Sequence, residues 1–360
     1  MLTLLIALVG FLVTLLVIIG IHEFGHFLAA RLLGIKVLRF SIGFGKALWK
    51  RYDKTGTEYV IAAIPLGGYV KMLDTQENPV DPHEQHLAFN QQPFYKKCLV
   101  VIAGPLANFI LAFVLYWIVF IAGFTSIAPV TGNILPHSIA ANAGVPPHSE
   151  IIKIDHIPVS SWMSVIIRIL TRTGDTNTLS MTLKSPERQA ARTYQLNLQN
   201  WHMDNLKPDP LASLGIQPYE PAIPILRKNQ YGPIGAASHA WQNIYDFTSL
   251  NLAVMGKLLT GKVSLQSLGG PISIFQTAGL ALNNGIMPFL SFLAFLSISI
   301  GLINIFPIPG LDGGHLLFQA IEAIIRRPVP PAIVEISYRL GLILLFLLIF
   351  QSIVNDILRL

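Results

Sequence analysis

The chain has 360 residues, of which 52% are hydrophobic and only 12% are charged. Soluble globular proteins carry about a quarter of their residues as charged side chains, so this composition excludes an ordinary soluble enzyme and indicates an integral membrane protein. The formal net charge is +6, but we expect its distribution to report membrane orientation and expect no nucleic-acid partner. The single cysteine, Cys98, excludes an internal disulfide and a cysteine-based zinc site.

The first predicted element is an apolar helix from about Leu2 to Leu33. No charged residue occurs from Leu2 to Ile21, and an apolar run of ~20 residues is long enough to cross a bilayer. No Lys or Arg precedes the run and no small-residue cleavage site follows it. We therefore interpret it as a retained transmembrane helix and not as a signal peptide.

An H-E-x-x-H motif, His22 to His26, lies at the far end of this helix. Positions i and i+4 share one face of a helix, so His22 and His26 can offer imidazole nitrogens to a single Zn²⁺ ion. Glu23, next to the first of these ligands, is the predicted general base. The alternative is a pair of hydrogen-bonded histidines facing a helix bundle, which leaves Glu23 unexplained.

The segment from Ile35 to Lys97 carries Lys and Arg near both predicted membrane edges. By the positive-inside rule this loop is cytoplasmic and the N-terminus lies outside. Within it the pattern predicts a strand at 58–65, a turn at 66–69 and a return strand at 69–72. An apolar hairpin between membrane segments indicates an element that dips into the membrane interior, where its edge can pair with an extended peptide. A surface hairpin covering the cytoplasmic end is the alternative.

A second membrane helix is predicted from about Cys98 to Phe124. Gly104 in this helix permits close helix packing, and Pro105 introduces a kink. Asn108 is a polar side chain at membrane depth and needs a hydrogen-bond partner.

Residues 127–220 are the one clearly polar stretch, with short alternating strands such as Glu150–Ile154 and Thr193–Leu198. They predict a single small α+β domain outside the membrane. In the following segment, 221–285, the amphipathic stretch 232–260 is expected to lie along the outer membrane surface. A helix docked on the soluble domain is the alternative.

A third membrane helix is predicted from Met287 to Phe306 and ends in a Pro- and Gly-rich stretch, Asn304–His315. Such a stretch cannot continue an ordinary helix, and unwound backbone at membrane depth is tolerable only where it lines a protein or water-filled site. Asp312 offers the third ligand that a catalytic zinc site requires, or it caps a helix that starts at Gly313. A fourth helix, Tyr338–Val354, returns the C-terminus to the outside.

The charge distribution tests the zinc hypothesis independently of the motif. Helices one and three both run from outside to inside under the positive-inside rule. The two histidines and Asp312, almost the whole chain apart, are therefore predicted at the same membrane depth, near the cytoplasmic side.

These residues resemble the site-2 protease family of intramembrane zinc metalloproteases. The motifs that carry the resemblance cover most of the chain and are residues 22–26, 44–45, 64–72, 104–109, 269–273 and 304–315. Residues 138–145 and 151–155 in addition resemble a PDZ domain. The resemblance implies a four-helix polytopic membrane protein with a membrane-dipping β-hairpin and one PDZ-like α+β domain, divided as 1–126, 127–220, 221–285 and 286–360.

The resemblance also implies a set of site residues with three roles. The zinc ligands would be His22, His26 and Asp312 and the catalytic base Glu23, while Asn304, Pro307, Pro309, Gly67, Gly68 and Tyr69 would bind the substrate.

The implied activity is zinc-dependent cleavage of transmembrane segments in pre-trimmed single-pass proteins, within regulated intramembrane proteolysis. The implied substrates are an anti-sigma factor and remnant signal peptides, and the implied location is a bacterial inner membrane with both termini and the PDZ-like domain in the periplasm. Related proteins carry two PDZ domains where this chain has room for one. Ser149-Glu150 and Asp155-His156 replace the usual Gly-Asp and Asp-Gly, so a steric gate is expected instead of a carboxylate site.

Two other classes of protein compete with this interpretation. A non-catalytic scaffold that tethers partners through a PDZ domain has no use for a glutamate beside a metal. A zinc-dependent transporter should carry polar residues on several helices, and the fourth helix offers almost none.

Overall fold

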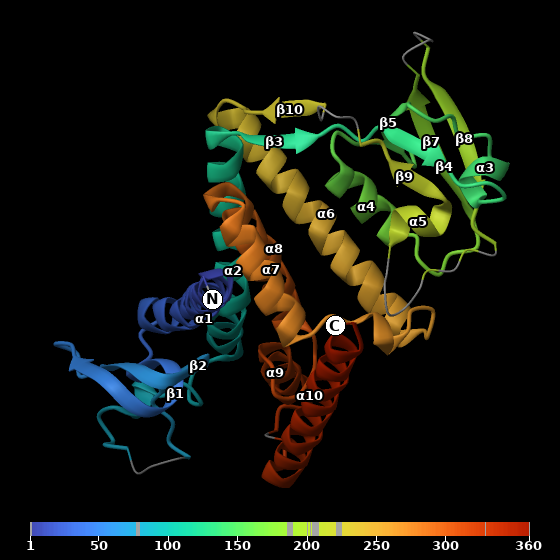
Figure 1. The fold of residues 1–360 in the computed structure, drawn as a ribbon. Coiled ribbons are helices and arrows are strands. Elements are labelled where there is room, and N and C mark those ends of the chain that lie inside the picture. The colour runs from blue at the N-terminus through green and yellow to red at the C-terminus, as the bar shows by residue number, and fades with distance from the viewer. Residues whose placement is uncertain are drawn as a thin grey trace. The chain divides into compact units, whose positions relative to one another are not determined.

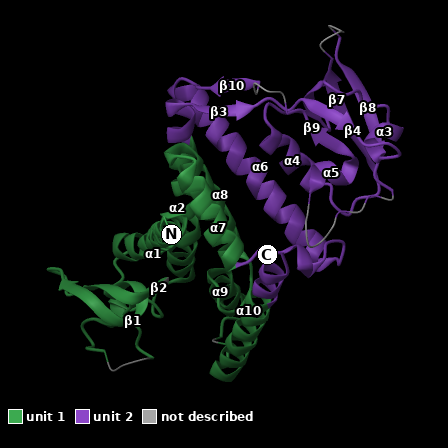
Figure 2. Cartoon of the chain, in the orientation of Figure 1, with its two compact units in different colours: residues 1–116, 271–350 green, residues 117–270, 351–360 purple. Residues whose placement is uncertain are grey.

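The computed structural model describes residues 2–359 except 77–79, 186–189, 200, 202, 204–208, 221–224 and 328, so the start of the predicted 221–285 segment lies outside the described residues. The chain forms two compact units (Figure 2). Unit 1 comprises residues 1–116 and 271–350, and unit 2 comprises residues 117–270 and 351–360.

Four helices among the described residues are long and apolar enough to cross a membrane, as predicted (Figure 1). They are α1 (Leu2–Leu32), α2 (Phe94–Ala122), α8 (Ile286–Ile305) and α10 (Pro331–Arg359). Helix α10 begins seven residues before the predicted start at Tyr338. The helix opens with Pro331, a favourable residue at a helix start, and the charged Glu335 follows four residues later, which hides this part of the helix from a hydropathy pattern.

Among the described residues, unit 1 contains two further α-helices, α7 (Pro271–Asn283) and α9 (Asp312–Ile325). The turn-like sequences Gly269-Gly270-Pro271 and Asn283-Asn284-Gly285 mark the two ends of α7, but the sequence analysis does not predict the helix between them. Helix α7 packs against α1 through small residues. A Cβ atom at Gly279 would lie only 2.5 Å from the Cβ of Ala7, so glycine is what allows the two backbones to approach.

The β-structure of unit 1 consists of β1 (Val37–Tyr52) and β2 (Glu58–Met72). The predicted pairing of 58–65 with 69–72 is wrong, because β1 runs between these two halves of β2. Residues Arg39–Ile42 pair with Glu58–Ile61 on one side and with Gly68–Lys71 on the other. The segment 68–72 therefore forms an edge of this sheet.

Unit 2 contains a mixed α+β core. A four-stranded sheet has the order β6-β5-β7-β8, and its apolar face packs against Val165 and Ile169 of a short helix. The elements in chain order are β3 (Phe124–Ile127), β4 (Thr131–Ile134), α3 (Ile139–Asn142), β5 (Glu150–Ile154), β6 (Ile157–Pro158), α4 (Trp162–Leu170), β7 (Thr178–Lys184), β8 (Arg192–Asn197), α5 (Pro210–Leu214), β9 (Ile216–Pro218) and β10 (Leu226–Asn229).

The long helix α6 (Pro233–Leu259) belongs to this unit and docks on its α+β core. Arg168 of α4 bonds Asp246 of α6 at 2.5 Å, with both side chains largely buried. Lys257 near the end of α6 lies 3.1 Å from Asp175. Of the two interpretations of this amphipathic stretch, the structure shows the helix docked on the soluble domain.

Candidate metal centre

Helix α1 carries both motif histidines on one buried face. The imidazole rings of His22 and His26 lie one helical turn apart in an edge-to-face arrangement, with ring centroids 4.9 Å apart and planes nearly perpendicular. Both residues are 8% exposed. Their Nε2 atoms lie 3.3 Å from each other, so the two rings point at a common centre.

Asp312 reaches the same centre from the other end of unit 1. Helix α8 ends at Ile305, the backbone is non-helical through Leu311, and α9 begins at Asp312. The predicted unwinding is thus present. The N-cap position is Leu311 and no side chain caps α9, so Asp312 does not serve as a helix cap. A Cβ at Gly313 would lie 2.0 Å from the carbonyl oxygen of Phe306, which shows how tightly the loop folds onto the helix start.

Three ligand atoms converge at this point. Oδ2 of Asp312 lies 3.1 Å from Nε2 of His22 and 3.2 Å from Nε2 of His26, and these residues form a possible metal-binding group. Four ligands at about 2.0–2.1 Å in a tetrahedron are separated by roughly 3.3 Å, so the observed spacing fits zinc. Oδ2 of Asp312 is also buried without a hydrogen-bond partner among the described residues, as expected of an atom reserved for a cation.

Helix α2 packs against α1 beside His26 and accepts a hydrogen bond from its ring. Nδ1 of His26 donates to the carbonyl oxygen of Val100 at 2.8 Å, which leaves the Nε2 lone pair free. Close approach depends on two glycines, since a Cβ at Gly25 would lie 2.3 Å from the carbonyl oxygen of Ala103 and a Cβ at Gly104 would lie 2.2 Å from Nε2 of His26. No side chain fits at Gly104 without moving a predicted ligand.

We therefore expect Gly104→Ala to weaken zinc binding. The added methyl group must displace the imidazole of His26. Loss of a residue that only orients a metal ligand weakens metal binding roughly 10-fold or more, and we expect at least that loss here. Chelator competition on the purified full chain measures this loss. Gly256→Ala in α6 is the matched control, because a Cβ there meets nothing within 4 Å. Equal zinc affinity for both variants would contradict the assignment.

Glu23 lies against the edge of the β-sheet. A Cβ added to Gly68 would lie 2.8 Å from Cγ of Glu23, so the edge segment passes directly over the predicted base. Its neighbour Gly67 has φ +150°, and a side chain there would collide with the ring of Phe44 at 2.2 Å. The two glycines thus let a bare backbone edge approach the site.

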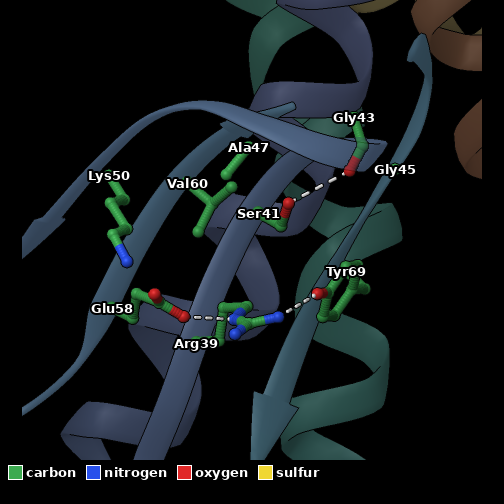
Figure 3. A pocket seen from close by; sticks show the side chains of 9 residues that line it. All are labelled: Arg39, Ser41, Gly43, Gly45, Ala47, Lys50, Glu58, Val60 and Tyr69. Atoms are coloured by element: carbon green, nitrogen blue, oxygen red, sulfur yellow. Dashed lines mark hydrogen bonds and ion pairs between the residues drawn. The ribbon is translucent and has the colours of Figure 1, made fainter. Parts of the chain in front are cut away.

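Tyr69, the third predicted residue of this edge, is held by a polar cluster on the sheet (Figure 3). Arg39 donates from Nε to Glu58 at 2.5 Å and from Nη1 to the Tyr69 hydroxyl at 3.0 Å. The Tyr69 ring stacks on Phe44 with centroids 6.1 Å apart and planes inclined by 8°. Arg39 and Phe44 therefore fix the side chain of this edge residue, and Glu58 holds Arg39 in place.

The remaining predicted residues lie on the connection that carries Asp312. Asn304 is half-buried in the last turn of α8, and Pro307 and Pro309 lie in the non-helical loop. The loop is fixed from α10, where a Cβ at Gly341 would lie 1.9 Å from the carbonyl oxygen of Pro309. These three residues shortly precede Asp312 in the chain, and their role in substrate binding stays a prediction.

Sequence reasoning missed three groups around the centre. The sequence indicated that Asn108 needs a hydrogen-bond partner but not which one, and its amide lies 3.3 Å from Nδ1 of His22. The carbonyl of Val100 carries no sequence signal at all. His315, one turn after Asp312, shares a hydrogen bond of 2.7 Å with the Tyr338 hydroxyl of α10, and burial lowers the pKa of its imidazole.

Comparison with known proteins relates nearly the whole chain to one protein family. The profile of peptidase family M50 matches residues 10–348. The regulator of sigma-E protease RseP of Escherichia coli K12 is 37% identical over 451 aligned positions that cover 100% of both chains. The regulator of sigma E protease of Haemophilus influenzae is 34% identical over 437 positions, with 98% of each chain covered. A Vibrio cholerae protein named as a zinc metalloprotease is 35% identical over 445 positions, again covering 98% of each chain.

Proposed function

The chain belongs to peptidase family M50, the site-2 protease family of membrane zinc metalloproteases, and from this premise we propose that it cleaves peptide bonds inside transmembrane segments. In this proposal His22, His26 and Asp312 hold the zinc ion and Glu23 is the general base. The supporting observation is the convergence of the three ligand atoms at 3.1–3.3 Å beside Glu23 at the end of an apolar helix.

The roles of the residues follow from their chemistry. Bound zinc supplies Lewis-acid chemistry and makes water acidic enough to react near neutral pH. Glu23 accepts the proton of the attacking water and passes a proton to the nitrogen of the leaving amine. His22, His26 and Asp312 hold their donor atoms at fixed separations, and the surrounding apolar helices exclude bulk water.

The substrate is proposed to bind as an added strand. A transmembrane helix must unwind before its carbonyl groups can reach the site, and pairing with the open edge at Gly67, Gly68 and Tyr69 would replace the helical hydrogen bonds that are lost. Asn304, with Pro307 and Pro309 shaping the loop, would hold the other side of the unwound segment. The sheet would dip into the protein-lined membrane interior. There the backbone N–H and C=O groups of the edge would form hydrogen bonds with the substrate and would not face lipid.

Replacement of Arg39 by Met tests the edge. The variant removes the hydrogen bond that orients Tyr69, at a cost of about 1–2 kcal/mol in substrate binding, which corresponds to a KM roughly 5–30-fold higher. We expect kcat and zinc content to change little. Arg51→Met, on the exposed outer part of the same sheet, is the control. A KM for Arg39→Met equal to that of the control would remove the edge from substrate binding.

The α+β core of unit 2 is proposed to be one PDZ-like domain that acts as a steric gate. The 451-position alignment leaves about 90 positions of the relative without a counterpart in these 360 residues, about the size of one small domain. The Asp155-His156 turn between β5 and β6 has φ values of +46° and +67°, so it keeps a conformation usually supplied by glycine. Substrates with large outer domains would be excluded until another protease trims them.

The proposed setting is a bacterial inner membrane, as the relatives and the apolar helices suggest. In this proposal both termini and the PDZ-like domain lie in the periplasm and the site lies near the cytoplasmic side; the positive-inside rule supports this orientation. By analogy with relatives named as regulators of sigma E, the proposed substrates are anti-sigma-factor-like single-pass proteins and remnant signal peptides, cleaved in regulated intramembrane proteolysis.

The proposal is tested with the full chain reconstituted in lipid vesicles. We expect cleavage of a single-pass test substrate that lacks an outer domain, loss of cleavage on treatment with a strong zinc chelator, and recovery on addition of zinc but not of magnesium. A version of the substrate with a bulky periplasmic domain is expected to be cleaved more slowly. Undiminished cleavage after zinc is removed would refute the proposed chemistry.

A further inference from the structure

The amide of Asn108 makes an incomplete contact with the site. Asn108 lies in α2 and its side chain is fully buried. Its Nδ2 lies 3.3 Å from Nδ1 of His22, whereas its Oδ1 is buried without a hydrogen-bond partner among the described residues. A buried carbonyl oxygen without a donor is unfavourable, so this orientation of the amide needs an explanation.

The position of one proton decides what His22 can bind. When the Asn108 amide donates to Nδ1 of His22, that nitrogen must carry a lone pair, and the proton of the neutral ring sits on Nε2. Nε2 is the atom that faces Oδ2 of Asp312 at 3.1 Å. In this form His22 can donate a hydrogen bond to Asp312, but it has no lone pair at Nε2 to offer a metal ion.

His26 has the opposite arrangement. Its Nδ1 lies 2.8 Å from the carbonyl oxygen of Val100, which can only accept, so its Nδ1 carries the proton and Nε2 the lone pair. Both outer contacts come from α2. For His22 to match His26, the group that faces its Nδ1 must be an acceptor as well.

A half turn of the amide provides that acceptor. The two ends of a carboxamide are nearly isosteric, so rotation about the last side-chain bond exchanges Oδ1 and Nδ2 in almost the same space. The main chain stays fixed, because Oγ of Ser297 donates to the carbonyl oxygen of Asn108 at 2.9 Å. The close contact of Gly301, where a Cβ would lie 3.1 Å from Cβ of Asn108, holds the helix in place.

We propose that Asn108 is a positioning residue for the metal: with zinc bound, its Oδ1 accepts the Nδ1–H of His22 and holds the ring in the metal-binding tautomer. The inference rests on the proposed function, since it requires His22 to be a zinc ligand. The rotation gives the buried Oδ1 a partner and moves Nδ2 to the position that Oδ1 held. Outer-shell acceptors of this kind fix ring orientation and raise the basicity of the ligand, and their loss typically weakens metal binding about 10- to 100-fold.

Zinc affinity of the full chain in detergent, measured by chelator competition, tests the assignment with two variants. Asn108→Leu keeps the volume but removes the acceptor, and we expect affinity to fall about 10- to 100-fold. Asn108→Asp supplies an acceptor that cannot donate, and we expect affinity within about threefold of the wild type because metal-bound histidines commonly donate their second ring N–H to a carboxylate. Ser299→Ala in α8, which removes a hydroxyl that donates to the carbonyl oxygen of Phe295 at 3.1 Å, is expected to bind zinc like the wild type.

The outcomes separate this inference from the proposed function. If wild-type protein binds one zinc ion and His22→Ala loses it, while Asn108→Leu binds as tightly as wild type, the inference fails and the proposed function stands. Asn108→Asp as weak as Asn108→Leu would also overturn it, because an acceptor would then not restore binding. If His22→Ala binds zinc like wild type, both fail. The melting temperature of each variant without zinc identifies any loss due to unfolding.

Discussion

Glu23→Gln is expected to abolish proteolysis while leaving zinc bound. The amide is almost the same size as the carboxylate but cannot take a proton from water, and removal of a general base typically costs about 10²–10⁴-fold in rate. Glu23 does not belong to the group of three residues whose ligand atoms converge, so the zinc content of the variant should stay at the wild-type level. Cleavage of a single-pass substrate in vesicles and metal analysis of the same preparation give the two readings.

Glu335→Gln is the matched control for this substitution. Glu335 is largely exposed and pairs with Arg339 on the same face of α10, so its conversion to an amide should leave cleavage unchanged. Proteolysis by Glu23→Gln at more than about a tenth of the control rate would be incompatible with a role as general base. Loss of zinc in that variant would instead point to a ligand role for Glu23.

Asp312→Ala is expected to have the second large effect, and on a different quantity. The variant removes one of three protein ligands. Removal of a residue that only hydrogen-bonds to a ligand lowers metal affinity about 10- to 100-fold, and we expect a larger loss for Asp312→Ala. Activity should fall with it and recover in part when excess zinc is supplied. Chelator competition and cleavage measured over a range of zinc concentrations test both statements.

Asp81→Ala provides the comparison for Asp312→Ala. Asp81 is an exposed loop residue whose carboxylate accepts from the backbone N–H of His83, and its removal should alter neither zinc content nor cleavage. Zinc binding by Asp312→Ala that matches this control would exclude the carboxylate from the metal site. Because Asp312 does not cap α9, loss of helix capping offers no competing explanation.

The local features of the chain could be predicted from the sequence because each depends on neighbours within a few residues. The i, i+4 spacing of His22 and His26 fixes a shared helix face, and the Pro- and Gly-rich stretch before Asp312 ends α8 wherever the rest of the chain lies. From the charge pattern we then predicted that Asp312 lies at the same membrane depth as the histidines. The structure brings these three residues together.

The features that were missed depend on contacts between distant segments. The insertion of β1 between the halves of β2 replaces the simple hairpin that the turn at 66–69 suggested. The docking of α6 depends on Arg168 meeting Asp246, 78 residues away. Helix α7 lies in a stretch without charges, where periodicity does not separate a helix from turns.

The hydrogen-bond partners of the two histidines also depend on contacts between distant segments. A backbone carbonyl such as that of Val100 has no residue type that could announce it, and it becomes a partner of His26 only when α1 and α2 pack through Gly25 and Gly104. Asn108 was conspicuous as a buried polar residue, but its partner could be named only from the fold.

The central claim is that two imidazoles and one carboxylate of this chain hold a single zinc ion. Zinc X-ray absorption spectroscopy on the purified full chain tests it most directly. We expect one zinc per chain, nitrogen and oxygen neighbours at about 2.0–2.1 Å, and the scattering pattern of two imidazole rings. A spectrum without imidazole scattering, or one that is unchanged when His22, His26 and Asp312 are all replaced by alanine, would contradict the account.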